Sequence, residues 1–322
     1  MDDFKIQRGL VRLPLGSERV VDADEEVFIL YSKSTSASKH RGLGYLDNHS
    51  DTLTINFDLQ VPPRPTSSVI KSKRKLARPL QDKTVEIQLV QDKTALRTRS
   101  GDTGSVVWKA SIDFAQLILQ QQHAKSPGAI LDPEKLGTAR ILELGSGTGL
   151  LSIALSPLVS HYTATDIEDL LPLVRKNLTL NFTGWPHKQG VSAPGHNVFV
   201  EELNWQTLHS TPQTRRTQIF PPPSPPIDLV LIVDCIYHPS LLAPLLAAMD
   251  HVSIPNLTAV VVVMELRAED VTREFLEGWL SLGNGDWEIW RIADEETAEG
   301  TGILEKESPY VIWVGWKGQL NG

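Results

Sequence analysis

The glycine-rich run at residues 141–149, Ile-Leu-Glu-Leu-Gly-Ser-Gly-Thr-Gly, constrains the fold of this chain more than any other segment. An apolar strand leads into three glycines at alternate positions, and an amphipathic stretch follows from Leu150. Glycines at such a turn let the backbone bend sharply and let a ligand lie against main-chain N–H groups. A second apolar strand, 161–165, ends in Asp166, at the spacing of about 20 residues that places an acid opposite a ribose in nucleotide-binding βαβ units. The sequence therefore predicts a site for an adenosine-containing cofactor.

The glycine spacing and Glu143 indicate which cofactor this is. A dinucleotide-binding loop reads G-x-G-x-x-G and has its helix N-terminus against a pyrophosphate, whereas Gly145, Gly147 and Gly149 form G-x-G-x-G. Glu143 would lie badly beside a pyrophosphate, but it suits a ligand with a cationic amino group, such as the methionine part of S-adenosylmethionine. The alternative is a strand-to-helix turn without a ligand, and the combination of Glu143, the glycines and Asp166 argues against it.

The composition excludes several other classes of protein. The 322 residues carry a net charge of −8, which gives no overall signature of nucleic-acid binding. Cys235 is the single cysteine, so intrachain disulfides are excluded, and the histidines show no spacing typical of zinc sites, so we expect no metal. The N-terminus does not resemble a signal peptide, and no apolar stretch is long enough to span a bilayer. We therefore expect an intracellular, cytoplasmic protein, with the nucleus as a second location and no membrane partner.

Residues 1–100 differ in pattern from the rest of the chain. Short β-like runs at 26–31, 53–59 and 84–90 alternate with loops rich in Ser, Pro and Lys. We therefore expect a β-rich N-terminal extension. The basic run 71–75 would contact ribosomal RNA or direct nuclear import, but a solvated loop is the favoured interpretation.

Residues 101–322 alternate between apolar strands and amphipathic helices. This alternation predicts an α/β fold with a doubly wound, Rossmann-like sheet, whose last two strands form an antiparallel pair without a crossover helix. The stretch 182–226 is rich in Pro, Gly, Thr and Gln, and we expect it to be a long surface loop, with a charged loop at 293–308. The expected strands are 140–144, 161–165, 198–201, 227–233, 258–264, 287–291 and 310–316, and the expected helices are 110–122, 149–157, 168–180, 239–250 and 271–282.

Asp234 and Tyr237 form a second constellation, directly after the apolar strand 227–233. Ligands of doubly wound sheets bind at the carboxyl ends of the strands, where the glycine loop and Asp166 also fall. On a helical turn the carboxylate and the phenol would point into one small volume, and together they can hold an amine by hydrogen bonds. The alternative is that Asp234 only caps the following helix and that Tyr237 belongs to the core.

Three further side chains are expected near this edge of the sheet. Trp108 precedes a predicted helix and would wall in the cofactor, although a lone tryptophan is more often part of the core. Trp205 lies where a loop after the third strand would pass an adenine, with an apolar surface plug as the alternative. Arg267 follows the strand 258–264, and we expect it to pair with Glu265 or another carboxylate rather than to act in catalysis.

Five motifs occur in a fixed order: Val106-Val107-Trp108, Glu143-Leu144-Gly145-Ser146-Gly147-Thr148-Gly149, Thr165-Asp166, Leu203-Asn204-Trp205 and Asp234-Cys235-Ile236-Tyr237. Together they resemble the seven-strand, S-adenosylmethionine-dependent protein-lysine methyltransferases of methyltransferase family 16. The resemblance covers about 101–316, and the Asp-x-x-Tyr motif is its most specific part. Within the family, the N-terminal extension and the Pro-rich insertion look most like those of the fungal ribosomal lysine methyltransferases that modify a large-subunit ribosomal protein.

The resemblance implies a class I methyltransferase fold at 101–322, S-adenosylmethionine as the cofactor and a protein lysine as the substrate, without direct binding of nucleic acid. It implies that Asp234 and Tyr237 are the catalytic residues that hold the target lysine. It also implies that seven residues line the cofactor beside Glu143: Trp108, Gly145, Ser146, Gly147, Asp166, Trp205 and Val233.

The chemistry of a lysine substrate limits what these residues can do. The amine must lose its proton before it attacks the sulfonium methyl, because free lysine has a pKa near 10.4. A carboxylate favours the ammonium form, so we assign Asp234 and Tyr237 to binding and orientation, and no strong general base is evident. Two alternatives stay open: a methyltransferase acting on a small molecule or nucleic acid, and a non-catalytic binding module that kept the fold. The absence of an Asn-Pro-Pro-Tyr motif argues against base methylation, and the retained glycine loop and acids argue against a binding module.

Overall fold

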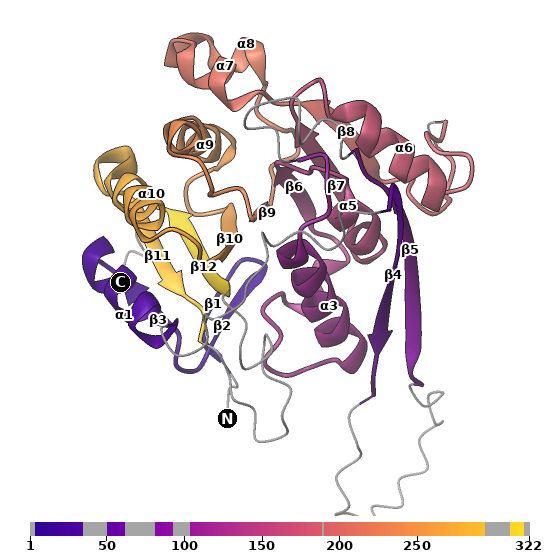
Figure 1. Ribbon diagram of the computed structural model, residues 1–322, viewed down its shortest axis with the longest axis horizontal. Coiled ribbons are helices and arrows are strands. Elements are labelled where there is room, and N and C mark those ends of the chain that lie inside the picture. The colour runs from indigo at the N-terminus through magenta and orange to yellow at the C-terminus, as the bar shows by residue number, and fades with distance from the viewer. Residues whose placement is uncertain are drawn as a thin grey trace, which may run out of the picture.

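Eight of the strands that the structure describes form one mixed sheet (Figure 1). The computed structural model describes residues 4–34, 50–61, 81–92, 104–188, 190–293 and 310–318. Across the sheet the strands are, in order, β3 (Glu18–Val20), β11 (Trp287–Arg291), β12 (Tyr310–Lys317), β10 (Ala259–Glu265), β9 (Leu229–Val233), β6 (Arg140–Leu144), β7 (His161–Asp166) and β8 (Val198–Glu202).

The directions of these strands confirm the predicted fold class. The run from β10 to β8 is parallel throughout, and β12 is antiparallel to both β10 and β11. This is a doubly wound, Rossmann-like sheet with a C-terminal antiparallel pair. The eighth strand, β3, adds to the seven expected ones by pairing with β11. It was not expected because three residues carry too little pattern to be recognised as a strand.

The central strands are apolar along their whole length because both faces of the sheet are covered. Every residue of β9 is buried, and its side chains alternate between two hydrophobic clusters. Leu229 and Leu231 pack into the cluster on one face, and Val230 and Ile232 pack into the cluster on the other. This alternation anchors β9 in the core on both faces, up to the edge where ligands bind in such sheets.

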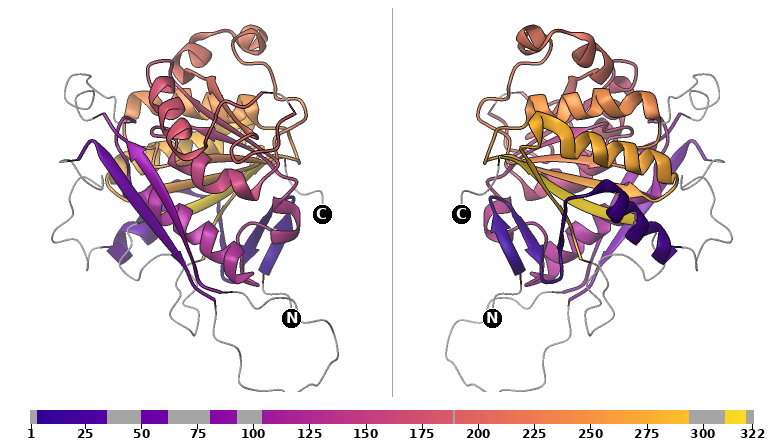
Figure 2. Two further views of the ribbon diagram at one scale, coloured as in Figure 1. Left: turned by 90° about the vertical axis from the view of Figure 1, so that its right-hand side faces the viewer. Right: turned by 90° about the vertical axis from the view of Figure 1, so that its left-hand side faces the viewer.

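Helices cover the two faces of the sheet (Figures 1 and 2). One hydrophobic cluster includes residues of α3 (Lys109–Ala124), α5 (Leu150–Leu155) and α6 (Leu171–Asn181), and the other includes residues of α1 (Ala23–Ser34), α9 (Pro239–Val252) and α10 (Glu269–Ser281). The predicted helices are confirmed with shifted ends. The α5 helix ends before Pro157 and α6 has Pro172 in its first turn, because proline disfavours a helical residue before it and suits a helix start.

Two β-hairpins precede the α/β part of the sequence. The first is β1 (Phe4–Arg8) with β2 (Val11–Pro14), and the second is β4 (Thr52–Leu59) with β5 (Lys83–Val90), so the expected strands at 53–59 and 84–90 are confirmed. The second hairpin lies against α6, where the Asn177 side chain donates to Val90 O at 2.9 Å and accepts from Val90 N at 2.7 Å. Asn181 bonds Gln88 in the same way. These amides satisfy the open edge of β5.

The expected β-like run at 26–31 is wrong, because this segment belongs to the helix α1. The Asp22 carboxylate accepts a hydrogen bond from Glu25 N at 2.8 Å, and acids fill the first turn of the helix. Both features stabilise a helix N-terminus. Val27 is fully buried while Phe28 is 74% exposed, as expected for one inner face of a helix. The division of the chain at residue 100 stays a prediction.

The interpretation of 182–226 as one long surface loop is also wrong. Besides β8, the stretch contains α7 (Trp205–Ser210) and α8 (Arg216–Ile219), and Leu208 and Phe220 are buried in the core. Asn204 caps α7 by accepting from Thr207 N at 3.1 Å, a local signal that the composition of the stretch conceals. One more short helix, α4 (Pro133–Leu136), precedes β6.

The basic run 71–75 and nearly all of the charged stretch 293–308 lie outside the described residues. Within the described ranges, none of the helices has both the length and the apolar character needed to cross a membrane.

Candidate functional site

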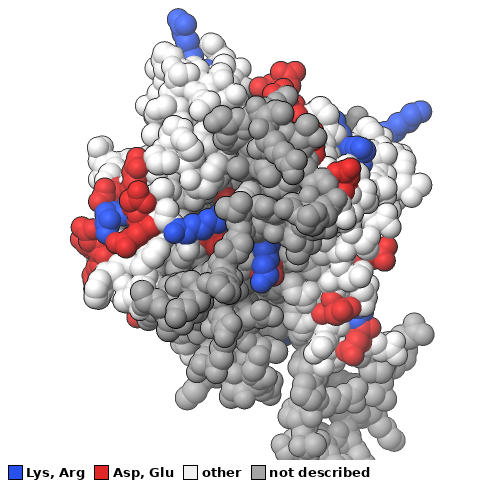
Figure 3. Space-filling view, in the orientation of Figure 1, with Lys and Arg blue, Asp and Glu red and all other residues white. Residues whose placement is uncertain are grey.

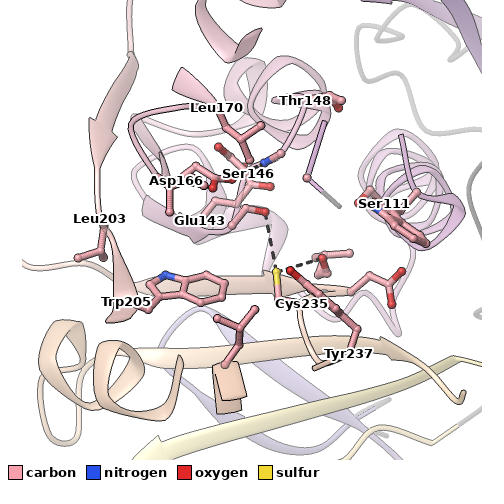
Figure 4. A pocket seen from close by; sticks show the side chains of 18 of the residues that line it. Ser111, Glu143, Ser146, Thr148, Asp166, Leu170, Leu203, Trp205, Cys235 and Tyr237 are labelled. Carbon is pink, nitrogen blue, oxygen red and sulfur yellow. Dashed lines mark hydrogen bonds between the residues drawn. The ribbon is translucent and has the colours of Figure 1, made fainter. Parts of the chain in front are cut away.

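A pocket of about 350 Å³ lies at the carboxyl ends of β6, β7 and β9 (Figure 4). Figure 4 shows side chains from separate elements around this one space, with Glu143 and Asp166 near the glycine loop and Cys235 and Tyr237 across from them. The structure brings together all ten residues that the sequence predicts for the site: Trp108, Glu143, Gly145, Ser146, Gly147, Asp166, Trp205, Val233, Asp234 and Tyr237.

The glycine loop forms one wall of this pocket, and its backbone requires glycine. Gly145, Gly147 and Gly149 have φ values of 78°, 55° and 79°, which side-chain-bearing residues rarely adopt. A Cβ on Gly145 would lie 2.7 Å from Cys235 Sγ, and one on Gly147 would lie 2.9 Å from the carbonyl oxygen of Gly104. The loop therefore packs closely on its neighbours and presents main-chain atoms to the pocket.

Glu143 is buried beneath this loop. Among the described residues, one side chain forms a hydrogen bond with its carboxyl group. The Tyr162 hydroxyl donates to Glu143 Oε2 at 2.9 Å. Burial raises the pKa of Glu143 to about 8, an effect that the Tyr162 hydrogen bond opposes and the Asp166 charge reinforces. A carboxyl group with a raised pKa binds a proton more readily, and it would ionise beside a cationic ligand group. The sequence patterns assign no role to Tyr162, because its contact with Glu143 depends on the pairing of β6 with β7.

Asp166 ties the glycine loop to the end of β7. Its Oδ2 accepts from Gly147 N at 2.8 Å, and its Oδ1 accepts from Ile167 N, also at 2.8 Å. A carboxylate has about four lone-pair sites. Asp166 can therefore hold the loop and still accept hydroxyl hydrogens from a ligand.

Two buried polar atoms of pocket residues have no hydrogen-bond partner among the described residues: Ser146 Oγ and Trp205 Nε1. Buried polar atoms are normally paired, and an unpaired one at a pocket wall indicates a place for a polar ligand atom. The Trp205 side chain stands at the wall opposite Asp166 and Leu170 in Figure 4. A ligand with an aromatic ring and several polar groups fits this wall.

Cys235, to which the sequence patterns assign no role, also lines the pocket. Its side chain is buried, and Sγ lies 3.4 Å from the carbonyl oxygen of Leu144. Burial raises the pKa of the thiol well above its usual range, and nearby carboxylates raise it further. The thiol therefore stays neutral and is no nucleophile.

Asp234 turns its carboxylate toward β10 and into an ion pair with Arg267. Arg267 Nη1 donates to Asp234 Oδ1 at 2.8 Å, Nη2 donates to Oδ2 at 2.6 Å, and Nη2 also donates to Glu265 Oε2 at 2.7 Å. The expected pairing of Arg267 with Glu265 or another carboxylate is confirmed. The guanidinium carbon lies 5.0 Å from the ring centroid of Trp108. Trp108 thus contributes to the pocket wall and to the support of Arg267.

The alternative role of Asp234 as a helix cap is wrong. The N-cap of α9 is His238, whose side chain accepts from Ser240 N, and Asp234 lies four residues earlier in a non-helical segment with a φ of 59°. Tyr237 is half-buried and lines the pocket, although the segment from Asp234 to His238 does not form the expected helical turn.

The sequence of this chain is similar to a protein-family model and to several known proteins. The model of the lysine methyltransferase family matches residues 89–279. A diaminohydroxyphosphoribosylamino-pyrimidine deaminase of Schizosaccharomyces pombe is 31% identical over 240 residues, which cover 73% of this chain and 52% of that protein.

Among the relatives are proteins named as lysine-modifying enzymes. A protein-lysine methyltransferase of Bos taurus is 32% identical over 166 residues, 52% of this chain and 49% of that protein. A protein-lysine N-methyltransferase of Saccharomyces cerevisiae is 30% identical over 147 residues, 42% of this chain and 52% of that protein. The chain spans about half the length of these relatives. On the match of the family model, which takes in the glycine loop, Asp166, Asp234 and Tyr237, this chain belongs to the lysine methyltransferase family.

Proposed function

We propose that this protein is an S-adenosylmethionine-dependent protein-lysine N-methyltransferase. The observation that carries the proposal is the convergence of two groups on one pocket. The glycine loop, Glu143 and Asp166 line one side, and Asp234 and Tyr237 line the other. The family match and the names of the two lysine-modifying relatives support the same activity.

The residues of the pocket fit the cofactor. Asp166 has acceptor capacity for ribose hydroxyls, Glu143 would face the cationic amino group, and the unpaired Ser146 Oγ and Trp205 Nε1 offer hydrogen bonds to its polar atoms. When bound, S-adenosylmethionine supplies an electrophilic methyl group, which a neutral amine takes up while the electron pair of the breaking C–S bond stays on sulfur. The remaining tasks fall to the protein, which binds the amine, orients it and lets it lose a proton.

Asp234 and Tyr237 are the residues that we propose to orient the target lysine. The phenol of Tyr237 can accept from or donate to an amine. The Asp234 side chain is 1% exposed and its two oxygens already accept from Arg267. An amine that reaches Asp234 therefore shares this carboxylate with the guanidinium.

For the substrate, we propose a lysine of a large-subunit ribosomal protein, encountered in the cytoplasm. The support is the resemblance of the N-terminal extension and of the inserted stretch to those of the fungal ribosomal enzymes. A deaminase activity like that named for the relative of Schizosaccharomyces pombe has no basis in this chain. Zinc-dependent nucleobase deaminases need a Cys-x-x-Cys pair among their ligands, and this chain has one cysteine.

Labelling of a cell extract tests the proposal. The protein is incubated with S-adenosylmethionine carrying a radioactive methyl group and with an extract of cells that lack the protein. Protease-sensitive label that appears as methyl-lysine after acid hydrolysis is the expected result. Nuclease-sensitive label would indicate a nucleic-acid methyltransferase, and cofactor binding without any label would indicate a binding module. Either outcome would overturn the proposal.

A further inference from the structure

Arg267 offsets one of the two negative charges that Asp234 and Glu265 bring to the pocket edge. The Asp234 and Glu265 carboxylates have side chains only 1% and 9% exposed, so water screens them little. Arg267 is the cation that bonds both of them, and its own side chain is 28% exposed. Together the three groups carry a net charge of −1.

Other elements around the cluster add little net charge to it. From α3, Asp113 lies 3.9 Å from Lys109, which compensates it. From β12, Tyr310 is buried, and burial together with Asp113 raises the pKa of its phenol, so it stays neutral. Tyr237 lies in the pocket as a phenol, and His238 follows it at the pocket rim.

The acids near the glycine loop, Asp166 and Glu143, have partners other than Arg267. Asp166 accepts two backbone N–H groups, and burial favours the neutral form of Glu143. Cys235 is a neutral thiol. The charge that an amine beside Asp234 would experience is therefore set mainly by Asp234, Glu265 and Arg267.

An amine nucleophile must be neutral, and a nearby negative charge holds it as an ammonium ion. With Arg267 present, the guanidinium and the sulfonium charge of a bound cofactor would together balance the two carboxylates. Without Arg267 one negative charge is left over, and the ammonium ion would be stabilised. The proton that the amine gives up passes to water.

We propose that Arg267 is a positioning residue that compensates the charge of Asp234, so that a substrate amine can bind beside this carboxylate and still lose its proton. The inference rests on the proposed function and deepens it. The planar guanidinium is suited to the task because it bonds both oxygens of Asp234 at once and fixes the carboxylate plane. Trp108 supports its face at 5.0 Å.

The first test measures binding and needs no protein substrate. S-adenosylmethionine carries a sulfonium charge that S-adenosylhomocysteine lacks. Calorimetry on purified Arg267→Gln should therefore show a preference for the charged ligand about threefold to tenfold larger than in the wild-type protein, because one positive charge has left the pocket. Arg267→Lys keeps the charge and should keep the wild-type ratio.

Arg273→Gln is the matched control. Arg273 also bonds two carboxylates, Asp24 at 2.6 Å and Glu269 at 2.8 Å, but it lies outside the pocket, on α10. Figure 3 shows acidic side chains gathered on the side of the molecule where α1 and α10 lie. The control should bind both ligands as the wild-type protein does.

The second test is the pH profile of methyl transfer to the proteins of an extract from cells that lack this protein. For Arg267→Gln, the rising limb of the profile should move about one pH unit toward alkaline pH, because the amine holds its proton more tightly. Arg267→Lys should keep the wild-type pH dependence even where its maximal rate is lower. Circular dichroism verifies that each variant is folded.

Three results would overturn the inference. If Arg267→Gln weakens both ligands equally and leaves the pH profile in place, Arg267 has a structural role only. If Arg267→Gln is faster than the wild-type protein at neutral pH, Arg267 blocks the place of the amine instead. If the wild-type protein itself methylates no lysine, the proposed function is wrong and so is the inference. This failure is distinguishable from the other two, because it appears in the wild-type protein before any variant is measured.

Discussion

The Tyr162 hydroxyl donates to Glu143 Oε2 at 2.9 Å, and both side chains are buried below the glycine loop. This pair places a buried, ionisable acid among the residues that line the pocket. Burial, partly offset by the Tyr162 hydrogen bond, raises the pKa of Glu143 from 4.5 to about 8. The pair therefore links the protonation of the pocket to the stability of the protein.

We predict that Glu143 makes stability fall as pH rises. The pKa is higher in the folded than in the unfolded state, so the folded protein binds the extra proton between pH 4.5 and about 8. The contribution of Glu143 is fully present below pH 4.5 and lost as pH rises through about 8. Urea unfolding measures the free energy of unfolding of the wild-type protein and of Glu143→Gln. The difference between the two values, wild type minus variant, should decline by up to about 1 kcal/mol per pH unit over this range. Parallel curves for the two proteins would show that Glu143 is already ionised.

Gly147→Ala should destabilise the protein, because it combines a strained backbone with a close contact. The residue would adopt a φ of 55°, and its Cβ would lie 2.9 Å from Gly104 O. We expect a loss of about 1–3 kcal/mol in the free energy of unfolding, together with weaker cofactor binding. Gly137→Ala is the control, since Gly137 has a φ of −61° and open space around a Cβ. Equal effects of the two substitutions would contradict the account of the loop.

Asp166→Ala should weaken the binding of S-adenosylmethionine by about tenfold or more, because charge-assisted hydrogen bonds to the ribose are lost. The same change removes the acceptor for Gly147 N. Glu168→Gln, an exposed acid two residues further along, should leave affinity unchanged. Titration calorimetry measures the affinity of both variants for S-adenosylmethionine. If Asp166→Ala lowers this affinity by less than about twofold, Asp166 does not belong to the cofactor site.

Asp234→Asn should affect methyl transfer without affecting the contacts of the cofactor with the glycine loop. The amide keeps the shape of the side chain but changes the group that faces Arg267 and the amine. We expect methyl transfer to be abolished while affinity for S-adenosylhomocysteine, which lacks the sulfonium charge, stays within about threefold of the wild-type value, since the cofactor contacts lie at the glycine loop. Activity and affinity are measured on the same purified sample. Full activity in this variant would remove Asp234 from the substrate site.

The fold of the α/β part can be predicted from the sequence because its signals are long and regular. The wholly apolar run at 227–233 corresponds to β9, and the predicted helix at 239–250 to α9. The sequence misleads where a local helix N-cap opposes the secondary structure that the composition of the segment favours. The β-branched and aromatic run at 26–31 looks like a strand, but Asp22 and the acids behind it start a helix there. Asn204 does the same for α7.

The pocket could be predicted as a set of residues, because parallel strands deliver their carboxyl ends to one edge. Its internal pairing could be predicted only in part. Arg267 follows β10 and Asp234 follows β9, and these strands pair in parallel, so an ion pair between their ends was foreseeable. That Arg267 would occupy both oxygens of Asp234 depends on the positive φ of Asp234, which no sequence pattern reveals.

The central claim, methylation of a protein lysine, is tested most directly by mass spectrometry of ribosomal proteins. Large subunits are compared from cells that lack the protein, from the same cells given the wild-type gene, and from cells given Asp234→Asn. The account predicts one methyl-lysine that is absent without the protein, returns with the wild-type gene and does not return with Asp234→Asn. The same methyl-lysines in all three samples, with methyl label from the purified protein entering nucleic acid or no macromolecule at all, would contradict it.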